Sequence, residues 1–276
     1  MTRLILASDL HFSYWGWYGY SSPDRMELFV SDMHAHYKKR PFESVLFLGD
    51  VSRDHGIWEI CGSWLDHKTS FTDRFIKEYA ARLPASWHLI PGNHEQYGSE
   101  TWRKITGRER QYSVVIGGYL IIFCDNFAKD LDPDFHTDGV YTVTDLDFVR
   151  AELAKTPDLP VLLCSHFFDA RLETEEFFKL LREEKRITAL FCGHDHLNYI
   201  EELGEKGGNL LLYHDGSFSH SSGGAEALWG YCEVELRDDG IEAVYISPER
   251  EVKVDFQPYH HPYAEHNRIF IPRRDL

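Results

Sequence analysis

The stretch His88-Leu89-Ile90-Pro91-Gly92-Asn93-His94-Glu95 joins a short apolar run to a group of polar side chains. The apolar run is typical of a buried strand, and the Pro-Gly pair marks the point where that strand ends. An amide, an imidazole and a carboxylate then follow side by side. Because open α/β sheets bind their ligands beyond the carboxyl ends of the strands, this stretch predicts a strand of such a sheet with a functional site at its end.

Four further polar clusters follow apolar runs in the same way. They are Asp9-Leu10-His11 after 4–7, Gly49-Asp50 after 45–48, Ser165-His166 after 161–164, and Gly193-His194-Asp195-His196 after 190–192. A single histidine after a strand is usually a surface or capping residue. Five such clusters, each after a predicted strand, indicate one shared site. We therefore expect the clusters to converge, although they are spread over residues 9–196.

The side chains of these clusters are typical metal ligands. The carboxylates of Asp9 and Asp50, the amide of Asn93 and the imidazoles of His11, His166, His194 and His196 supply oxygen and nitrogen donors without thiolate. This mixture suits Mn, Fe or Zn better than a structural zinc site. Seven ligands are too many for one ion, so we expect two divalent ions that share a bridging carboxylate. In Asp9-x-His11 and His194-x-His196, an extended backbone would point both side chains the same way.

Apolar periodicity predicts alternating strands and helices along most of the chain. Strands are expected at 3–7, 44–48, 87–90, 112–116, 119–124, 161–164, 189–192, 210–213, 231–236 and 241–246, and helices at 24–39, 71–83, 144–154 and 173–185. Thr144 is expected to cap the third helix. This alternation indicates an α/β domain, and the predicted hairpins require either a mixed sheet or two sheets.

The two ends of the chain differ in pattern. We expect a catalytic domain over residues 1–250 and a C-terminal extension over 251–276, packed on the domain or on a partner. From residue 256 onward the sequence is rich in His, Pro and Arg and has no clear period. The first residues are too soon acidic for a signal peptide, so they are expected to form a strand.

Composition narrows the function classes. The chain has 276 residues, of which 43% are hydrophobic, and a formal net charge of −16. This charge argues against general nucleic-acid binding, and no apolar run approaches the roughly 20 residues of a membrane helix. A bound metal pair would still allow a phosphate substrate. We expect the protein to be cytoplasmic. Its five cysteines are expected to be buried reduced thiols; they are Cys61, Cys124, Cys164, Cys192 and Cys232.

The order of the clusters resembles the calcineurin-like metallophosphoesterase superfamily. Its pattern is D-x-H, G-D, G-N-H-[DE], a lone His and G-H-x-H, and all five elements are present here between residues 9 and 196. The resemblance implies an α/β fold of two mixed β-sheets packed face to face with flanking helices, a four-layer sandwich. The strand-rich region after Asn209 agrees with it.

The resemblance also implies a role for each residue. Asp9, His11 and His196 would hold the first metal, Asn93, His166 and His194 the second, and Asp50 would bridge the two. His94 would not be a ligand but would stand over the phosphate as the catalytic residue. The implied reaction is the attack of metal-bound hydroxide on phosphorus in a phosphate ester, with His94 donating a hydrogen bond or a proton to the leaving oxygen.

Departures from the family patterns narrow the membership. Purple acid phosphatases have Tyr where this chain has Arg53, and they lack the histidine present here as His11. The run 49–56 departs from the G-D-x-x-D-R-G of Ser/Thr protein phosphatases, and lipid-A pathway members have Arg in place of His94. The chain therefore resembles the broad bacterial-type phosphodiesterase and phosphatase groups.

Residues outside the motifs are expected to bind the substrate and to orient the metal ligands. Arg53 is a candidate to bind a phosphate oxygen, and Trp15 and Trp17, in the aromatic insert 12–20, are candidates to stack on a base or another aromatic group. The alternative interpretation of the insert is a packed hydrophobic flap or a subunit contact. Carboxylates are expected to orient the ligating imidazoles; the candidates are Glu95, Asp54 and Asp195. His214 and His220 follow a late strand, at the rim of the site.

We expect a phosphodiesterase acting on a small or nucleotide-like phosphate ester, with no membrane and no nucleic-acid partner. A phosphomonoesterase, including a protein phosphatase, is the first alternative. A metal-dependent nuclease is another, and the net charge of −16 counts against it. A metal-bound scaffold without catalysis is the last, and the complete set of motif residues counts against it.

Overall fold

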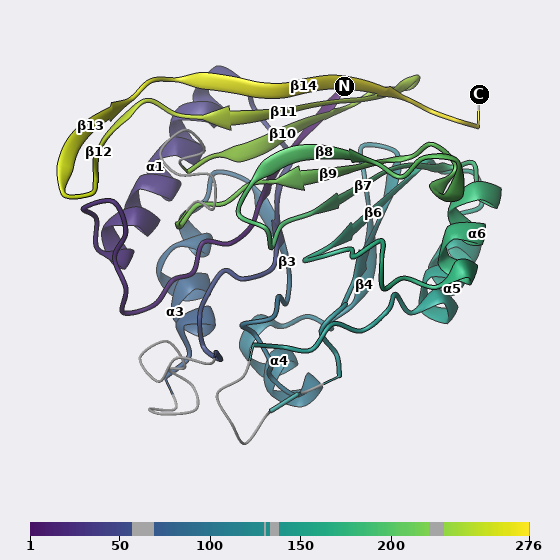
Figure 1. Cartoon of the computed structure of the whole chain (residues 1–276), viewed down its shortest axis with the longest axis horizontal. Helices are drawn as coiled ribbons and strands as arrows, with labels where there is room; N and C mark the ends of the chain where they lie inside the picture. The colour runs from purple at the N-terminus through teal and green to yellow at the C-terminus, as the bar shows by residue number, and fades with distance from the viewer. Residues whose placement is uncertain (57–68, 130, 133–137, 221–228, 276) are drawn as a thin grey trace.

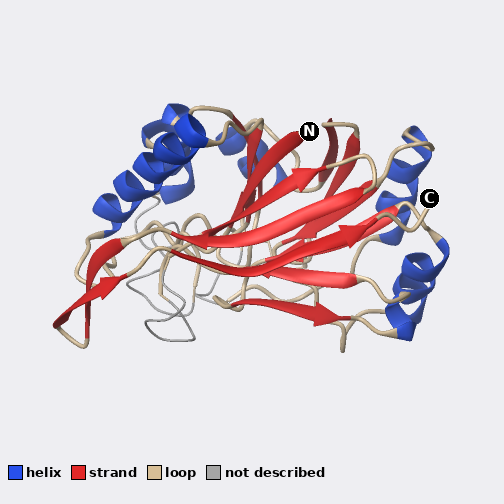
Figure 2. Ribbon diagram, turned by 90° about the horizontal axis from the view of Figure 1, so that it is seen from above, coloured by secondary structure: helices blue, strands red, loops and turns tan. Residues whose placement is uncertain are grey.

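The computed structural model describes residues 1–56, 69–129, 131–132, 138–220 and 229–275. Two six-stranded β-sheets lie at its centre, with helices at either side (Figures 1 and 2). The first sheet has the order β14 (Ala264–Pro272), β11 (Gly240–Ser247), β10 (Tyr231–Leu236), β1 (Thr2–Ala7), β2 (Ser44–Leu48) and β3 (Ser86–Ile90). The second has the order β4 (Tyr112–Ile116), β5 (Tyr119–Cys124), β6 (Val161–Ser165), β7 (Ile187–Cys192), β9 (Leu211–Asp215) and β8 (Asn198–Glu202).

Both sheets are mixed. In the first, β1, β2 and β3 run parallel, whereas β10, β11 and β14 pair antiparallel. In the second, β5, β6, β7 and β9 run parallel, with β4 and β8 antiparallel at the two edges. The expected fold class, α/β with two mixed sheets and flanking helices, is therefore confirmed.

Alternation along the strands places one core between the sheets. Leu4 and Leu6 of β1 face the second sheet and pack in one buried cluster with Phe123, Leu162 and Phe191. Their neighbours in sequence point to the opposite face, where helices cover them. Both faces of the central strands are thus buried, which explains why these strands are nearly continuous apolar runs.

Helices cover the outer face of each sheet. The first sheet is covered by α1 (Ser22–Lys39) and α3 (Phe71–Glu78), and the second by α5 (Leu146–Lys155) and α6 (Glu175–Glu183). A further helix, α4 (Ser99–Thr106), follows the motif of β3, and two 3₁₀ turns lie at Ala80–Arg82 and Glu205–Gly207. Within the described residues, no helix has both the length and the apolar character needed to cross a bilayer.

Some details differ from the expectations. Asp145, rather than Thr144, caps α5, because its carboxylate accepts the N–H of Phe148, while the Thr144 hydroxyl donates to Glu173. The four described cysteines are buried and unpaired, as expected; they are Cys124, Cys164, Cys192 and Cys232. Cys61 lies outside the described residues.

The C-terminal residues form regular structure. β12 (Arg250–Val254) and β13 (Gln257–His261) make a hairpin that extends from the body of the molecule (Figures 1 and 2), and β14 then pairs with β11 as an edge of the first sheet. The pattern of apolar residues did not predict these strands from residue 256 onward. The expected boundary after residue 250 falls inside β12.

Candidate metal centre

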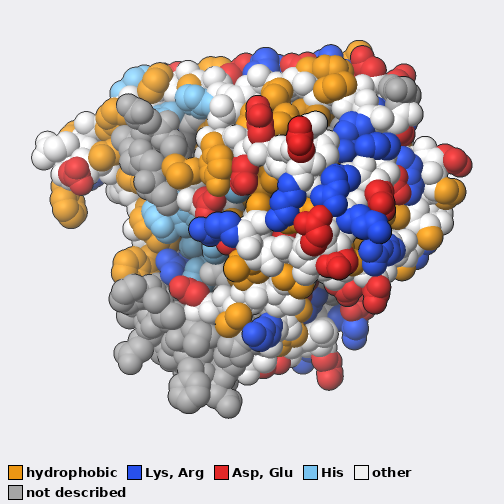
Figure 3. Space-filling model, turned by 45° about the vertical axis from the view of Figure 1, so that its right-hand side comes forward, with side chains coloured by type: hydrophobic (Ala, Val, Ile, Leu, Met, Phe, Trp, Pro, Cys, Tyr) orange, Lys and Arg blue, Asp and Glu red, His pale blue; other side chains and the backbone are white. Residues whose placement is uncertain are grey.

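The seven candidate ligands come from five strand ends. Asp9 and His11 follow β1, Asp50 follows β2 and Asn93 follows β3, all in the first sheet, whereas His166 follows β6 and the pair His194 and His196 follows β7 in the second. All but His194 are buried. Figure 3 shows histidine side chains gathered together on one face of the molecule. The site therefore lies where the carboxyl ends of parallel strands from both sheets meet.

The backbone at these positions is unusual. Five of the seven residues have positive φ angles, which L-residues rarely adopt; they are Asp9 (52°), His11 (48°), Asp50 (51°), His194 (73°) and His196 (55°). The expected extended backbone in the two x-spaced pairs is therefore wrong. Such conformations cost about 1–3 kcal/mol each and persist where the surroundings impose them, often at functional sites. Here the N–H of Asp9 donates to Gly49 O and that of His11 to Asp50 O, at 3.1 and 2.9 Å, which joins two of these turns.

Gly49 and Gly92 allow the close approach of neighbouring ligands. A Cβ on Gly49, whose φ is +90°, would lie 2.6 Å from Nδ1 of His166, and a Cβ on Gly92 would collide with the carboxylate of Asp50. Glycine is required at both positions because the side chains of other strand ends occupy the space.

One group of donors surrounds Asp9. Its Oδ1 lies 3.1 Å from Nε2 of His196 and 3.4 Å from Nε2 of His11, which is itself 3.5 Å from Oδ2 of Asp50. Ligands bound to one ion at about 2.0–2.2 Å lie about 2.8–3.6 Å from one another. Asp9 Oδ1 and His11 Nε2 are buried without a hydrogen-bond partner among the described residues. These unpaired atoms and distances fit an ion among the three residues and Asp50.

A second group surrounds Asn93. Its Oδ1 lies 3.0 Å from both Nε2 of His166 and Nδ1 of His194, and these two nitrogens are 3.2 Å apart. Nε2 of His166 is also 3.3 Å from Oδ2 of Asp50. One carboxylate oxygen of Asp50 therefore faces both groups. The arrangement is consistent with a binuclear metal site that shares this oxygen.

Each carboxylate is fixed through its other oxygen. Oδ1 of Asp50 accepts the N–H of His94 at 2.9 Å. Oδ2 of Asp9 accepts the N–H of His194 at 2.8 Å and the hydroxyl of Ser8 at 2.5 Å. Burial opposes ionisation of both aspartates, but the surrounding imidazoles hold the pKa of each well below its usual range. Both are therefore available as carboxylates that face the centre with one oxygen.

Backbone carbonyls, rather than carboxylates, orient two of the four imidazoles. Nδ1 of His166 is 2.8 Å from Leu48 O, and Nδ1 of His196 is 3.1 Å from His220 O. A carbonyl only accepts, so Nδ1–H donates and Nε2 keeps its lone pair for an ion.

The three carboxylates that were expected to orient the imidazoles accept hydrogen bonds from other groups. Glu95 accepts the backbone N–H groups of Asp50, Ser52 and Gly92, and burial raises its pKa to about 8. Asp54 accepts N–H groups at the start of α3, and Asp195 accepts the hydroxyl of Tyr199. Glu95 and Asp54 thus hold the backbone around the site rather than its histidine rings.

His94 lies beside both groups without sharing their short distances. Its Nδ1 is 2.7 Å from His55 O, and its Nε2 is 3.8 Å from Oδ2 of Asp50. Burial lowers the pKa of His94, the carboxylate of Asp50 opposes this effect, and the positive charge of Arg53 adds to it. The ring of His94 therefore faces the shared oxygen of Asp50 with Nε2.

The aromatic insert divides into separate parts. The Trp17 ring lies edge-on to His11, with centroids 6.2 Å apart, whereas Trp15 is exposed and contacts none of these histidine rings among the described residues. Tyr18 and Tyr20 pack on Trp229. The structure thus brings Trp17, but not Trp15, to the centre.

Sequence reasoning missed three residues of the surroundings. Ser8 bridges Asp9 and Asp215, whose pKa burial raises well above its usual range. Arg25 is fully buried below the turn that carries His11. His220, placed only at the rim, has its ring centroid 4.1 Å from that of His196. No local pattern marks Ser8 or Arg25, since their partners are remote in sequence.

The family described as Calcineurin-like phosphoesterase matches residues 2–198. The chain belongs to this family, as its motifs indicated. The matched region contains every strand end that contributes to the site.

Solved structures agree on the fold. The chain is similar to GAP50, described as the anchor in the inner membrane complex of Plasmodium, with a TM-score of 0.55 and 10% identity over 95% of this chain and 89% of that one. It is also similar to the purple acid phosphatase PPD1 of yellow lupin (Lupinus luteus), with a TM-score of 0.52 and 11% identity over 94% of this chain and 52% of that one. At such identities the likeness concerns the fold alone. Comparison with curated proteins gives no match.

Proposed function

We propose that this protein hydrolyses phosphate esters with two divalent metal ions, and that phosphodiesters of small or nucleotide-like alcohols are its substrates. The observation that carries the proposal is the shared oxygen of Asp50, which lies 3.5 Å from Nε2 of His11 and 3.3 Å from Nε2 of His166. Asp9, His11 and His196 would hold one ion, and Asn93, His166 and His194 the other. Their oxygen and nitrogen donors suit Mn, Fe or Zn.

When bound, such a pair of ions lowers the pKa of water toward neutrality and stabilises charge on phosphoryl oxygens. Asp9 and Asp50 provide only two negative charges against the four of two divalent ions. The site is therefore positive when loaded, which reconciles a phosphate substrate with a net charge of −16.

The protein's own groups would orient the ester and its leaving group. His94 presents Nε2 beside the shared oxygen, where it can donate to the leaving oxygen. Arg53, whose positive charge lowers the pKa of His94, is the candidate to bind a phosphoryl oxygen. Trp17 lies beside His11, where its ring can stack on an aromatic leaving group. The exposed Trp15 is a second stacking candidate.

The test pairs metal analysis with two substrates of the same leaving group, bis(p-nitrophenyl) phosphate and p-nitrophenyl phosphate. Two ions per chain and a preference for the diester support the proposal. Preference for the monoester would make the protein a phosphatase. Asp50→Ala is the control, since it removes the shared oxygen and should lower both metal content and activity.

A second role is open to the same site. A metal-bound scaffold without catalysis is the alternative, and GAP50, a protein of similar fold, is described as an anchor. Two bound ions without hydrolysis of any phosphomonoester, phosphodiester or cyclic nucleotide would favour it.

A further inference from the structure

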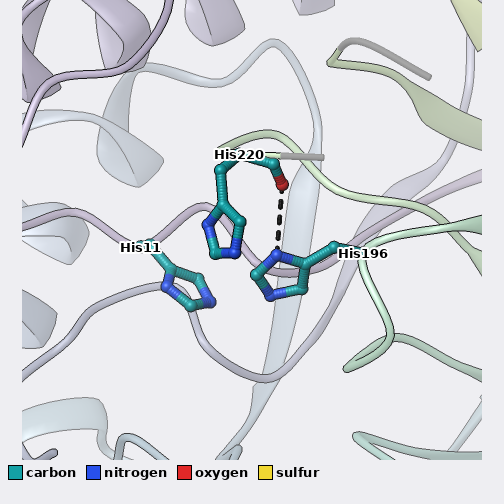
Figure 4. A group of neighbouring side chains, drawn as sticks. All are labelled: His11, His196 and His220. Atoms are coloured by element: carbon teal, nitrogen blue, oxygen red, sulfur yellow. Dashed lines mark hydrogen bonds between the residues drawn. The ribbon is translucent and has the colours of Figure 1, made fainter. Parts of the chain in front are cut away.

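A third imidazole faces the donor group of Asp9. Figure 4 shows the rings of His11, His196 and His220 converging from three segments of the chain. Ligand nitrogens of the three residues all lie within 4.8 Å of one another. Two ligands on opposite sides of one ion, with bonds of about 2.0–2.2 Å, lie about 4.0–4.4 Å apart. A shift below about 1 Å therefore brings all three nitrogens onto one ion.

The position of His220 is fixed through its backbone. Its carbonyl accepts the Nδ1–H of His196 and the hydroxyl of Ser217, both at 3.1 Å. The hydroxyl oxygen of Ser217 also lies 3.3 Å from Asp9 O. The residue that orients the His196 ring thus presents its own ring to the same place, on a loop tied to the Asp9 turn.

A buried guanidinium holds this loop against the turn of His11. Arg25 donates to Leu10 O at 2.8 Å and to Phe218 O at 2.6 Å, and it contacts no carboxylate among the described residues. Burying a guanidinium without a carboxylate partner costs free energy. Arg25 thus fixes the position of the loop that carries His220 relative to the turn that carries His11.

The His220 ring packs against Trp17, but one of its nitrogens has no hydrogen-bond partner in the described part of the chain. Trp17 stacks on it with centroids 5.6 Å apart and an interplanar angle of 30°. Nδ1 of His220 is buried without a hydrogen-bond partner among the described residues. A buried ring nitrogen usually finds a partner, so an imidazole held in this way points to a ligand that completes it.

We propose that His220 is a further ligand of the ion held by Asp9, His11 and His196. This inference rests on the proposed binuclear site and deepens it. The first position then has five protein donors, counting Asp50, whereas the second has four. The first ion is consequently bound more tightly, and its side next to Trp17 is closed by His220.

The test is a metal titration that needs no substrate. Chelator-stripped wild type and His220→Phe are titrated with Mn²⁺ or Zn²⁺ by calorimetry, and bound metal is counted after dialysis. Phe keeps a flat ring that can stack on Trp17 but has no nitrogen. We expect His220→Phe to weaken the tighter of the two binding steps by about 10–100-fold, the range for supporting residues of a metal site, or by more, and to leave the other step nearly unchanged.

Two further variants serve as a second test and as a control. His220→Ala should weaken the same step, and His260→Phe, in the exposed hairpin, should leave both steps as in wild type. Circular dichroism of the stripped proteins shows whether each variant is folded. Wild-type affinity in both folded His220 variants overturns the inference, and a raised KM with unchanged affinity would make His220 a substrate contact instead. Because the readout is binding, a protein that binds metal but hydrolyses nothing contradicts the proposed function and not this assignment.

Discussion

Asp50 joins the two donor groups because its two oxygens have different partners. Oδ1 accepts the N–H of His94, while Oδ2 faces His11 and His166, which belong to different groups. Its turn is held from outside by Glu95, whose carboxylate accepts the N–H of Asp50 at 2.9 Å and that of Gly92 at 2.8 Å. The same glutamate therefore fixes the ends of β2 and β3.

His94 offers the clearest separation of catalysis from metal binding. We expect His94→Ala to keep both ions and to lower kcat for alkyl phosphodiesters by about 10²–10⁴-fold, the usual contribution of a positioned acid. The loss should be much smaller for nitrophenyl esters, because nitrophenolate leaves without protonation. Metal content and kcat on the two ester types are the measurements. If His94→Ala empties a metal position, the residue is a ligand and its assigned role is wrong.

Ser8 tests whether contacts behind the ligands matter. Its hydroxyl lies 2.5 Å from Asp9 Oδ2 and 2.6 Å from Asp215 Oδ1. Ser8→Ala removes one of the contacts that fix the Asp9 carboxylate, so we expect metal affinity at the first position to fall by about 10–100-fold. Equilibrium dialysis measures this change. Ser44→Ala, which removes a buried hydroxyl that bonds Ser86 O at the far end of β2, is the comparison. Equal affinity in Ser8→Ala and wild type would show that the remaining contacts suffice.

The sequence revealed the residues whose chemistry follows a strand directly. Asn93 and His166 were predicted as ligands because each comes shortly after an apolar run, and the structure places Oδ1 of Asn93 3.0 Å from Nε2 of His166. Arg25 was missed because an arginine on an amphipathic helix usually faces solvent. Its burial depends on carbonyls of Leu10 and Phe218, which only the tertiary fold supplies. Contacts between remote segments leave no local pattern.

At the scale of elements, β14 shows why an edge strand is hard to predict. Most of its residues are exposed, so it lacks the apolar alternation of β1 or β5, and its order comes from pairing with β11. The central strands, buried on both faces, were recognised with nearly correct bounds. β13, which is also mostly exposed, was missed for the same reason, whereas β12, whose burial alternates, spans the expected domain boundary.

This hairpin braces the aromatic insert. The N–H of Lys253 donates to Tyr18 O, and the hydroxyl of Tyr20 donates to Glu251 O, both at 2.8 Å. The insert is thus clamped on both sides of Gly19, and Trp17 is held beside His11 and His220. The packed-flap interpretation therefore fits Tyr18 and Tyr20, and Trp17 stays a candidate for substrate contact.

The two tryptophans of the insert consequently make a matched pair. We expect Trp17→Ala to raise KM for nucleotide-like diesters by about 5- to 150-fold, which corresponds to about 1–3 kcal/mol of lost stacking. Trp15→Ala should have a smaller effect, since Trp15 is exposed and away from the histidine rings. Steady-state kinetics on a nucleotide ester and on a small dialkyl ester measure the difference. Equal losses on both substrates would show that Trp17 acts only by supporting His220.

At the scale of the whole molecule, the candidate metal centre lies where the two sheets meet. Asp9, Asp50 and Asn93 come from the first sheet and His166 and His194 from the second, and they meet at distances as short as 3.0 Å. Without ions, two carboxylates and several imidazoles remain buried together with unpaired atoms. The fold therefore carries at its centre a group of side chains that is poorly satisfied by protein contacts alone, and such groups cost free energy.

Metal removal should consequently destabilise the whole fold. The unfolded chain does not hold the five strand ends together, so each ion binds the native state and stabilises it by about 2.7 kcal/mol when its concentration is 100 times Kd. For a chain of this size about 1 kcal/mol corresponds to about 2–4 °C in Tm. We expect chelation to lower Tm by at least about 5 °C, and added Mn²⁺ or Zn²⁺ to restore it. Calorimetry of Asp50→Ala supplies the control, because a chain without the shared oxygen should respond little to either treatment. A wild-type Tm that is indifferent to chelator, with both ions shown to be removed, would mean that the two sheets are held by their apolar core without help from the centre.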